Sequence, residues 1–432
     1  MTTASIDPAV GPPPATPPLA RPAPAAAGPT PAPEGRVAAA LCYAVTGLAI
    51  VLGVCAGFRY LTDSTQMDHF LTPHHTDPEA AFANWDGQWY VRIARDGYSY
   101  NPDRMSSVAF FPVFPLVGRV LVLATGLDYD VALTLVSNLF FLSTLVLLAR
   151  YVRVVHPGGP PGLPEAAAVA LGVYPPGFFF RMAYSDSLFL FLAVLVLYGL
   201  ARRWPLVLVA ALVGLATAAR PVGVALAPPV LLAVWGRYPS LRQRLAAGAV
   251  LAPLCGWGLA AYVAYQAAAF GDPLAFSKTQ TYWRFRDAPS RAENLAAVAT
   301  LKPFWEVYDE SSAAYWRRHD CQLGPGCSLQ FANPIYFAAV AGLVGFGWWR
   351  RWLTPAEAVF AAGVLFIPYV TKAYEGCMSS QARYSAVAVP AYIVLGRLLL
   401  YLPRPLAAAA VAGSGFLMSV YAALFAGWFL FI

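Results

Sequence analysis

The stretch VAAALCYAVTGLAIVLGVCAGF, residues 37–58, contains no charged side chain. About 20 consecutive apolar residues are enough to cross a bilayer as a helix, and similar runs recur from here to the C-terminus. The whole chain of 432 residues is 59% hydrophobic and only 12% charged, whereas a soluble domain has about a quarter charged residues. The sequence therefore predicts an all-α, polytopic transmembrane helical bundle. It excludes a soluble enzyme, a disordered protein, a nucleic-acid-binding module and a single-span anchor.

Two parts of unequal length follow from the composition. Residues 1–35 are dominated by Pro, Ala and Gly and predict a disordered cytoplasmic tail, because such a segment cannot bury apolar surface. Residues 36–432 form the membrane domain. Its net charge of +7 comes mostly from Arg at the ends of apolar runs, which the positive-inside rule places in the cytoplasm. These cytoplasmic positions are Arg36, Arg150, Arg153, Arg202, Arg203, Arg237, Arg242, Arg244, Arg350, Arg351 and Arg404.

About eleven spans fit between these basic positions. They lie near 37–58, 131–149, 166–182, 187–201, 205–219, 222–236, 245–270, 333–349, 356–371, 385–401 and 406–430. The apolar segment 110–126 is interpreted as an interfacial or re-entrant helix on the outer side, because a crossing there would invert every later basic cluster; a twelfth span is the alternative. Long outer loops then cover about 59–130 and 271–332, with short outer turns near 183–186 and 372–384.

The segment NWDGQWYVRIARDGYSY, residues 84–100, is the strongest local signal. Asn84 is a suitable N-cap, and Gly97 is a typical helix stop. Trp85 and Trp89, with Tyr90 beside them, predict a short amphipathic helix lying in the membrane interface. Asp86 in its first turn either caps the helix or acts as a general base, within reach of an acceptor hydroxyl from water and a co-substrate from lipid.

Two further positions lie between apolar runs. Asp186, in AYSDS, shares the outer side with Asp86 and is a candidate for orienting a substrate, although an acid in an outer turn is more often simply solvated. Arg220, in TAARPVG, has almost no loop around it. An Arg at such depth is costly unless it is paired or functional. It either snorkels to the headgroups or binds a donor phosphate through its bidentate guanidinium.

The second outer loop opens with GDPLAFSKTQTYWRFR, residues 271–286. Lys278, Gln280 and Trp283 combine polar groups with an aromatic face and are candidates for binding a sugar, although an interfacial helix would have the same composition. Arg383, before the penultimate span, lies on the outer side against the positive-inside bias. Its presence there needs a phosphate, a headgroup or an acidic partner such as Glu375.

Cys321 and Cys327 share the second outer loop with a spacing of C-x5-C. A disulfide between them is plausible in an oxidising exterior. A metal site is the weaker interpretation, because no matching second pair of ligands exists.

The run NWDGQWYVRIARDGY, followed by AFFPVFPL, AYSDSLF, ATAARPVG, GDPLAF and a late ARY, resembles the GPI mannosyltransferase II (PIG-V-like) family. This family is part of the GT-C membrane glycosyltransferases, and the resemblance is to its bacterial branch. It implies a GT-C-like fold, a polyprenyl-phosphate sugar donor with mannose as the usual sugar, and a catalytic Asp that maps onto Asp86. Some relatives have two acids one residue apart, whereas Gly87 and Gln88 follow Asp86 here, so no cofactor is predicted and a divalent metal is kept as the alternative.

The function predicted from these observations is an inverting glycosyl transfer on the outer face of the cell membrane, from a polyprenyl-phosphate donor to an acceptor hydroxyl. Asp86 is the expected base, and Arg220 and Arg383 are expected at the donor phosphate. The partners are membrane lipid, the donor, and a glycan, lipid or protein acceptor, with no nucleic acid. A transporter or flippase of lipid-linked sugars and a polymerase or ligase of cell-surface glycans are the alternatives.

Overall fold

The computed structural model describes residues 33–61, 78–287, 289–318 and 324–429. Within these ranges the chain is helical and contains no strand, which confirms the all-α prediction. Single 3-10 turns and one π-turn, η7, carry the label η. The elements in chain order are α1 (Pro33–Tyr60), η1 (Pro78–Ala83), α3 (Asp86–Asp96), η2 (Ser107–Ala109), α4 (Val113–Thr125), α5 (Tyr129–Val155), α6 (Leu163–Gly172), η3 (Pro175–Arg181), α7 (Asp186–Ala201), α8 (Leu206–Ala219), η4 (Pro221–Leu226), α9 (Ala227–Arg237), α10 (Leu241–Phe270), α11 (Ala275–Lys278), η5 (Thr279–Trp283), α12 (Arg291–Ala299), α13 (Lys302–Glu306), η6 (Trp316–Arg318), α14 (Leu329–Trp349), α15 (Pro355–Pro368), η7 (Tyr369–Ala373), α16 (Gln381–Ser385), α17 (Pro390–Tyr401) and α18 (Arg404–Ala426).

Several of these helices are long and apolar enough to cross a membrane. Among the described residues there are six, or seven if η3 and α7, which meet at a bend of 98°, form one span. The six are α1, α5, α10, α14, α15 with η7, and α18. Shorter apolar helices occupy the other predicted positions, so the figure of eleven spans stays a prediction, while a multi-pass membrane protein follows from the long helices alone.

The predicted boundaries differ from the observed ones where proline interrupts an apolar run. The predicted span 166–182 is divided into α6 and η3, because Pro175 and Pro176 follow the end of α6. The predicted tail, residues 1–35, lies outside the described residues except for its last three, which begin α1. Helix α4 has 13 residues and is therefore about 20 Å long, too short to cross a core of about 30 Å unaided.

Close contacts between helices depend on glycine. Gly53 and Gly57 on α1 form a G-x-x-x-G pattern, and their α-carbons lie against the backbone carbonyls of Ser419 and Ala423 on α18. A β-carbon at either glycine would overlap those carbonyl oxygens. Small residues at this spacing let two membrane helices approach closely, so the first and last described helices pack as a pair.

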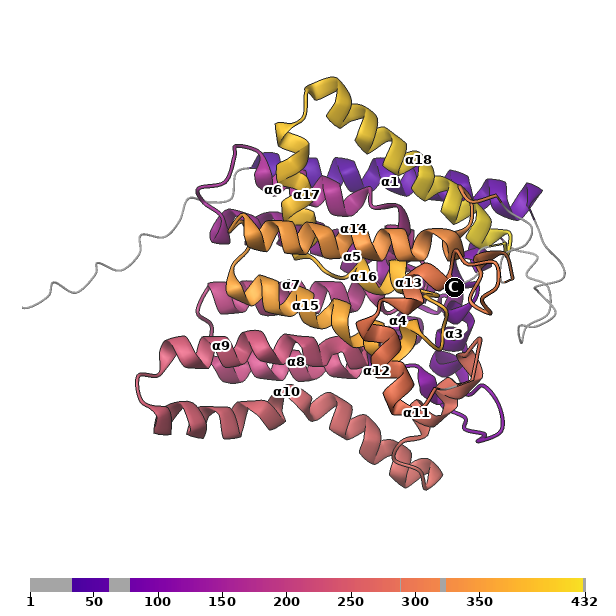
Figure 1. Ribbon diagram of the computed structural model, residues 1–432, viewed down its shortest axis with the longest axis horizontal. Helices are drawn as coiled ribbons and strands as arrows, with labels where there is room; N and C mark the ends of the chain where they lie inside the picture. The colour runs from indigo at the N-terminus through magenta and orange to yellow at the C-terminus, as the bar shows by residue number, and fades with distance from the viewer. Residues whose placement is uncertain (1–32, 62–77, 288, 319–323, 430–432) are drawn as a thin grey trace, which may run out of the picture. The chain divides into compact units, whose positions relative to one another are not determined.

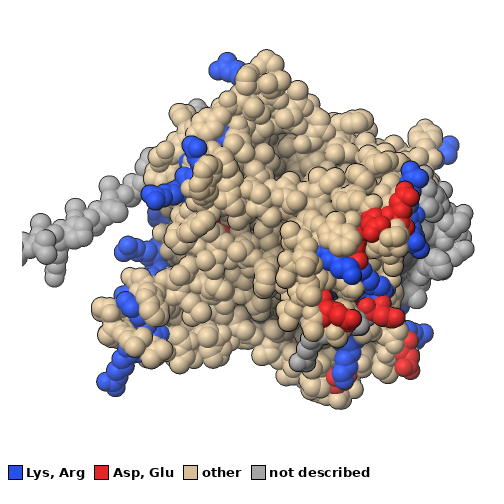
Figure 2. Space-filling model, viewed as in Figure 1, with Lys and Arg blue, Asp and Glu red and all other residues tan. Residues whose placement is uncertain are grey.

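Charge is distributed unevenly along the bundle. Figure 1 shows α3, α11, α12 and α13 gathered at one end, and the link between α9 and α10 at the other. In Figure 2 the face between the two ends carries almost no charge; Lys and Arg gather near the link between α9 and α10, whereas acidic and basic groups are mixed at the opposite end. The mixed end holds the pocket described next.

Candidate active site

Helix α3 begins at an unusual turn. Trp85 has a φ of 58°, in the left-handed region that a bulky residue rarely adopts. The turn is fixed by Tyr184, whose hydroxyl accepts a hydrogen bond from the Asp86 backbone N–H (3.1 Å) and donates to the Asn84 carbonyl (3.0 Å). The prediction of Asn84 as N-cap is wrong, because its side-chain amide donates instead to the carbonyls of Phe425 and Ala426 at the end of α18.

The apolar side of α3 packs within the protein. Trp89 stacks on Phe110 with 5.8 Å between ring centroids, and Trp85 lies against Trp428 at 5.1 Å. Both tryptophans are buried against the protein, and the location of this helix in the membrane interface stays a prediction. The predicted stop is confirmed, since Gly97 has a φ of 85° and donates its backbone N–H to the carbonyl of Ile93.

Asp86 belongs to a network of four side chains with alternating charge: Asp86, Arg383, Asp186 and Arg220. Arg383 on α16 donates from Nη1 to Asp86 Oδ2 (2.7 Å) and from Nε and Nη2 to Asp186 Oδ2 (3.1 and 2.9 Å). Arg220, the residue after α8, pairs with the other oxygen of Asp186. The Arg383 guanidinium also lies 4.3 Å from the centroid of the Tyr184 ring, a cation–π contact.

The members of this charged network are buried to different degrees. The Asp186 side chain is 0% exposed and that of Arg383 5%, whereas Asp86 keeps 24% of its side chain exposed. Burial alone would lower the pKa of Arg383, but the carboxylates of Asp186 and Asp86 outweigh it and raise that pKa well above its ordinary value. Arg383 therefore stays charged, and the most accessible member is the carboxylate of Asp86, ahead of Arg220 with 11% of its side chain exposed.

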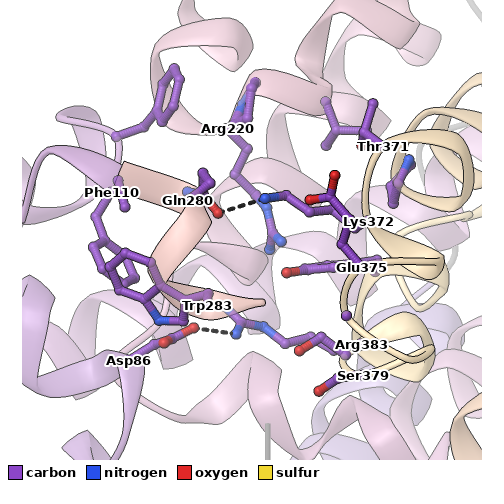
Figure 3. Close-up of a pocket in the computed structure, with 18 of the residues that line it drawn as sticks. Asp86, Phe110, Arg220, Gln280, Trp283, Thr371, Lys372, Glu375, Ser379 and Arg383 are labelled. Atoms are coloured by element: carbon purple, nitrogen blue, oxygen red, sulfur yellow. Dashed lines mark hydrogen bonds and ion pairs between the residues drawn. The ribbon is translucent and has the colours of Figure 1, made fainter. Parts of the chain in front are cut away.

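A cavity of about 440 Å³ lies beside Asp86 (Figure 3). It is bounded by the turn before α3, the segment 105–111, the region around Arg220, the loop 280–285 and the segment 367–387. Its walls combine aromatic rings with both signs of charge, which suits a ligand with an apolar part, a sugar and an anion. The charged and hydroxyl-bearing residues on it are Asp86, Tyr90, Arg220, Tyr282, Arg284, Thr371, Lys372, Glu375, Ser379, Ser380, Arg383 and Tyr384.

Most of the residues singled out from the sequence meet at this pocket, and three do not. Trp89 packs behind the wall, Asp186 is buried beneath it, and Lys278 pairs with Asp272 at 2.8 Å with 63% of its side chain exposed. The expectation that Asp186 is solvated is wrong, because two guanidinium groups hold it in the interior. The predicted residues that line the pocket are Trp85, Asp86, Tyr90, Arg220, Gln280, Trp283 and Arg383.

The second outer loop is bonded to η7 and to the residues that follow it. Arg284 pairs with Glu375, and the Phe285 backbone N–H donates to the Glu375 carbonyl at 3.0 Å. Lys372 on η7 donates from Nζ to Gln280 Oε1 at 2.7 Å. The predicted acidic partner of Arg383, Glu375, pairs with Arg284 instead, and the two aspartates hold Arg383.

Several pocket residues were not singled out from the sequence. Lys372 lies on a π-turn, a feature that is common at functional sites but has no sequence signature. Ser379 lines the pocket and is buried, and its hydroxyl has no hydrogen-bond partner among the described residues. Because a buried hydroxyl is usually satisfied, this one is available to a bound ligand. The backbone before α16 is also strained, with φ of 62° at both Met378 and Ser380.

Two other predictions concern cysteines and metals. Cys321 lies outside the described residues, so its disulfide with Cys327 stays a prediction. In the part of the chain that the structure describes, no three His, Cys, Asp or Glu side chains come together in a group able to hold a metal ion.

Comparisons with known proteins give one match to a family and several to solved structures. The chain shows 15% identity to an Archaeoglobus fulgidus oligosaccharyltransferase in its apo form, with a TM-score of 0.43 over 88% of this chain and 56% of that one. The same enzyme tethered to an acceptor peptide gives 12% identity and a TM-score of 0.39, over 89% and 55% of the two chains. The present chain thus spans about half the length of that enzyme. No curated protein matches. Residues 76–253, which contain Asp86, Asp186 and Arg220, match the mannosyltransferase (PIG-V) family model, so the resemblance predicted from the W-D-G segment is confirmed over that region.

Proposed function

We propose that this chain is a membrane glycosyltransferase that moves a sugar, mannose by family analogy, from a polyprenyl-phosphate donor to an acceptor hydroxyl on the outer face of the cell membrane. The observation that carries the proposal is the pocket itself. One partly exposed carboxylate, Asp86, faces a cavity that also holds aromatic rings and an excess of cations. A transporter would bind a lipid-linked sugar through the same cations and aromatic rings, without a chemical step at Asp86.

Asp86 acts as the general base. Arg383 holds its Oδ2, and the Tyr184 hydroxyl holds its backbone N–H, so the carboxylate has a fixed direction relative to the pocket. Its other oxygen, Oδ1, carries neither of these bonds and is the one that accepts the proton of the acceptor hydroxyl. The acceptor oxygen then attacks the anomeric carbon, the bond from that carbon to the phosphate oxygen breaks, and polyprenyl phosphate leaves. A single displacement of this kind inverts the anomeric configuration.

The structure modifies the roles expected of the two arginines. Arg383 donates three hydrogen bonds to the two aspartates. This supports a positioning role rather than direct contact with phosphate. Arg220 lines the pocket and pairs with Asp186 through Nη1 alone, so its remaining N–H groups are available to the donor phosphate. The location on the outer face rests on the Arg-rich ends of the apolar helices, which the positive-inside rule assigns to the cytoplasm.

The test is a transfer assay with purified protein, polyprenyl-phosphate mannose and panels of glycan, lipid and peptide acceptors. Asp86→Asn should reduce turnover by about 10²-fold or more, the usual contribution of a general base, while donor binding stays within about twofold. Asp96→Asn, on the same helix but exposed and outside the pocket, is the matched control and should keep full turnover. Retention of most of the turnover by Asp86→Asn would refute the assignment of the base.

A further inference from the structure

The charges around the pocket do not cancel. Three carboxylates and three guanidinium groups are held in mutual ion pairs. These six residues are Asp86, Asp186, Glu375, Arg220, Arg284 and Arg383. Lys372 adds one further positive charge, and its hydrogen bond goes to a neutral partner, the side-chain oxygen of Gln280. The pocket region therefore carries one positive charge beyond its ion pairs, and that charge is located on Lys372.

The position of Lys372 is defined by the fold. It lies on the π-turn that continues α15, is half-buried, and is oriented by Gln280 from the outer loop. In Figure 3 the side chains of Lys372 and Arg220 point toward the same part of the pocket, while Asp86 and Arg383 lie toward another. An ammonium group that donates one N–H to Gln280 keeps two N–H groups for a ligand. The site thus has one region for an anion and another for the base.

We propose that Lys372, together with Arg220, binds the phosphate of the polyprenyl donor and stabilises it as the leaving group; this rests on the proposed function. The donor phosphate is a diester with one negative charge. When the bond to the anomeric carbon breaks, the electron pair stays on the phosphate oxygen, and the product monoester carries up to two negative charges. The charge on phosphate therefore grows in the transition state, and a positioned cation stabilises that state more than the bound substrate.

This assignment also explains the loop 280–285. Gln280 holds Lys372, and Trp283 from the same loop lines the pocket near Asp86 (Figure 3). A sugar attached to a phosphate at Lys372 would extend toward Asp86 and pass the ring of Trp283, which offers an apolar face. The second outer loop thereby contributes to both the phosphate and the sugar positions, although its residues are about 60 or more positions from Arg220 and nearly 200 from Asp86 in the sequence.

The experiment measures binding of farnesyl phosphate, a short prenyl monoester, and of uncharged farnesol to the detergent-purified full-length protein. Lys372→Met should weaken binding of farnesyl phosphate by tenfold or more and leave farnesol binding within about twofold, because only the phosphate contact is lost. Lys372→Arg should restore a large part of the affinity. Lys302→Met is the control, since this lysine is on the outer loop, outside the pocket, and pairs with Glu306; it should bind both compounds normally.

The outcomes separate this inference from the proposed function. Unchanged binding of farnesyl phosphate by Lys372→Met, or an equal loss of farnesol binding, would overturn the role of Lys372 even if Asp86-dependent sugar transfer is observed. If the wild-type protein transfers no sugar but its binding of farnesyl phosphate still depends on the charge at position 372, the phosphate site is supported and the proposed transfer reaction is refuted. Where transfer is measured, Lys372→Met should also lower kcat, because the contact strengthens as the bond breaks.

Discussion

Removal of Arg383 tests the network of alternating charged side chains around Asp86. In Arg383→Met, the fully buried Asp186 loses two hydrogen bonds and keeps Arg220 as its ion-pair partner, while Asp86 loses its contact at 2.7 Å. Breaking one partner out of a buried ion pair costs about 3–5 kcal/mol, since the remaining charge stays in a low-dielectric interior. At about 1.4 kcal/mol for each factor of ten, the ratio of folded to unfolded protein should fall by about 10²-fold to about 4 × 10³-fold.

The assay is equilibrium unfolding in mixed detergent micelles, followed by tryptophan fluorescence, for a double-mutant cycle. The cycle compares the wild type, Arg383→Met, Asp186→Asn and the double variant. Because the two residues are in direct contact, the double variant should be more stable than the sum of the single losses predicts, by about 1–3 kcal/mol. Arg119→Met, an exposed arginine on α4, is the control and should change stability by less than about 0.5 kcal/mol. Additive losses at Arg383 and Asp186 would refute the reasoning.

Two further predictions concern packing and the unpaired hydroxyl. Gly57→Val should destabilise the protein strongly, because a β-carbon there overlaps the Ala423 carbonyl. Gly248→Val on α10 is the control and should be tolerated, because a β-carbon at Gly248 meets open space. Thermal unfolding in detergent distinguishes the two variants, and equal melting temperatures would contradict the close packing of α1 on α18. Ser379→Ala should change the free energy of unfolding by less than about 0.5 kcal/mol, since no protein hydrogen bond is lost. It should raise the KM for donor or acceptor several-fold. Unchanged KM values for both substrates would exclude Ser379 from substrate binding.

The sequence predicted the fold class and part of the pocket because both leave local signals. Long uncharged runs indicate helices in lipid, and the W-D-G segment combines an acid with an amphipathic helix. Arg220 was noticeable because charge between two apolar runs is costly. Each of these signals lies within about 20 neighbouring residues, the range over which periodicity and composition can be compared.

The pairing of these residues had no such signal. Asp186 and Arg383 are 197 positions apart in the sequence, and only the complete fold brings the first residue of α7 to α16. Asn84 was expected to cap α3, but its amide reaches a helix more than 300 residues later. Lys372 has no local signal, because a lysine at the end of an apolar run is ordinary, and only the π-turn and Gln280 direct it into a cavity.

The contact between Asn84 and the end of α18 has a consequence for biogenesis. The amide at position 84 needs the carbonyls of Phe425 and Ala426, at 3.4 and 3.2 Å, to be in place. During synthesis those carbonyls emerge from the ribosome more than 300 residues after the turn that carries Asp86. A nascent chain arrested before α18 would hold all of the pocket-lining residues yet lack the contact that supports the turn before α3. That turn should therefore reach its observed geometry only once α18 is in place.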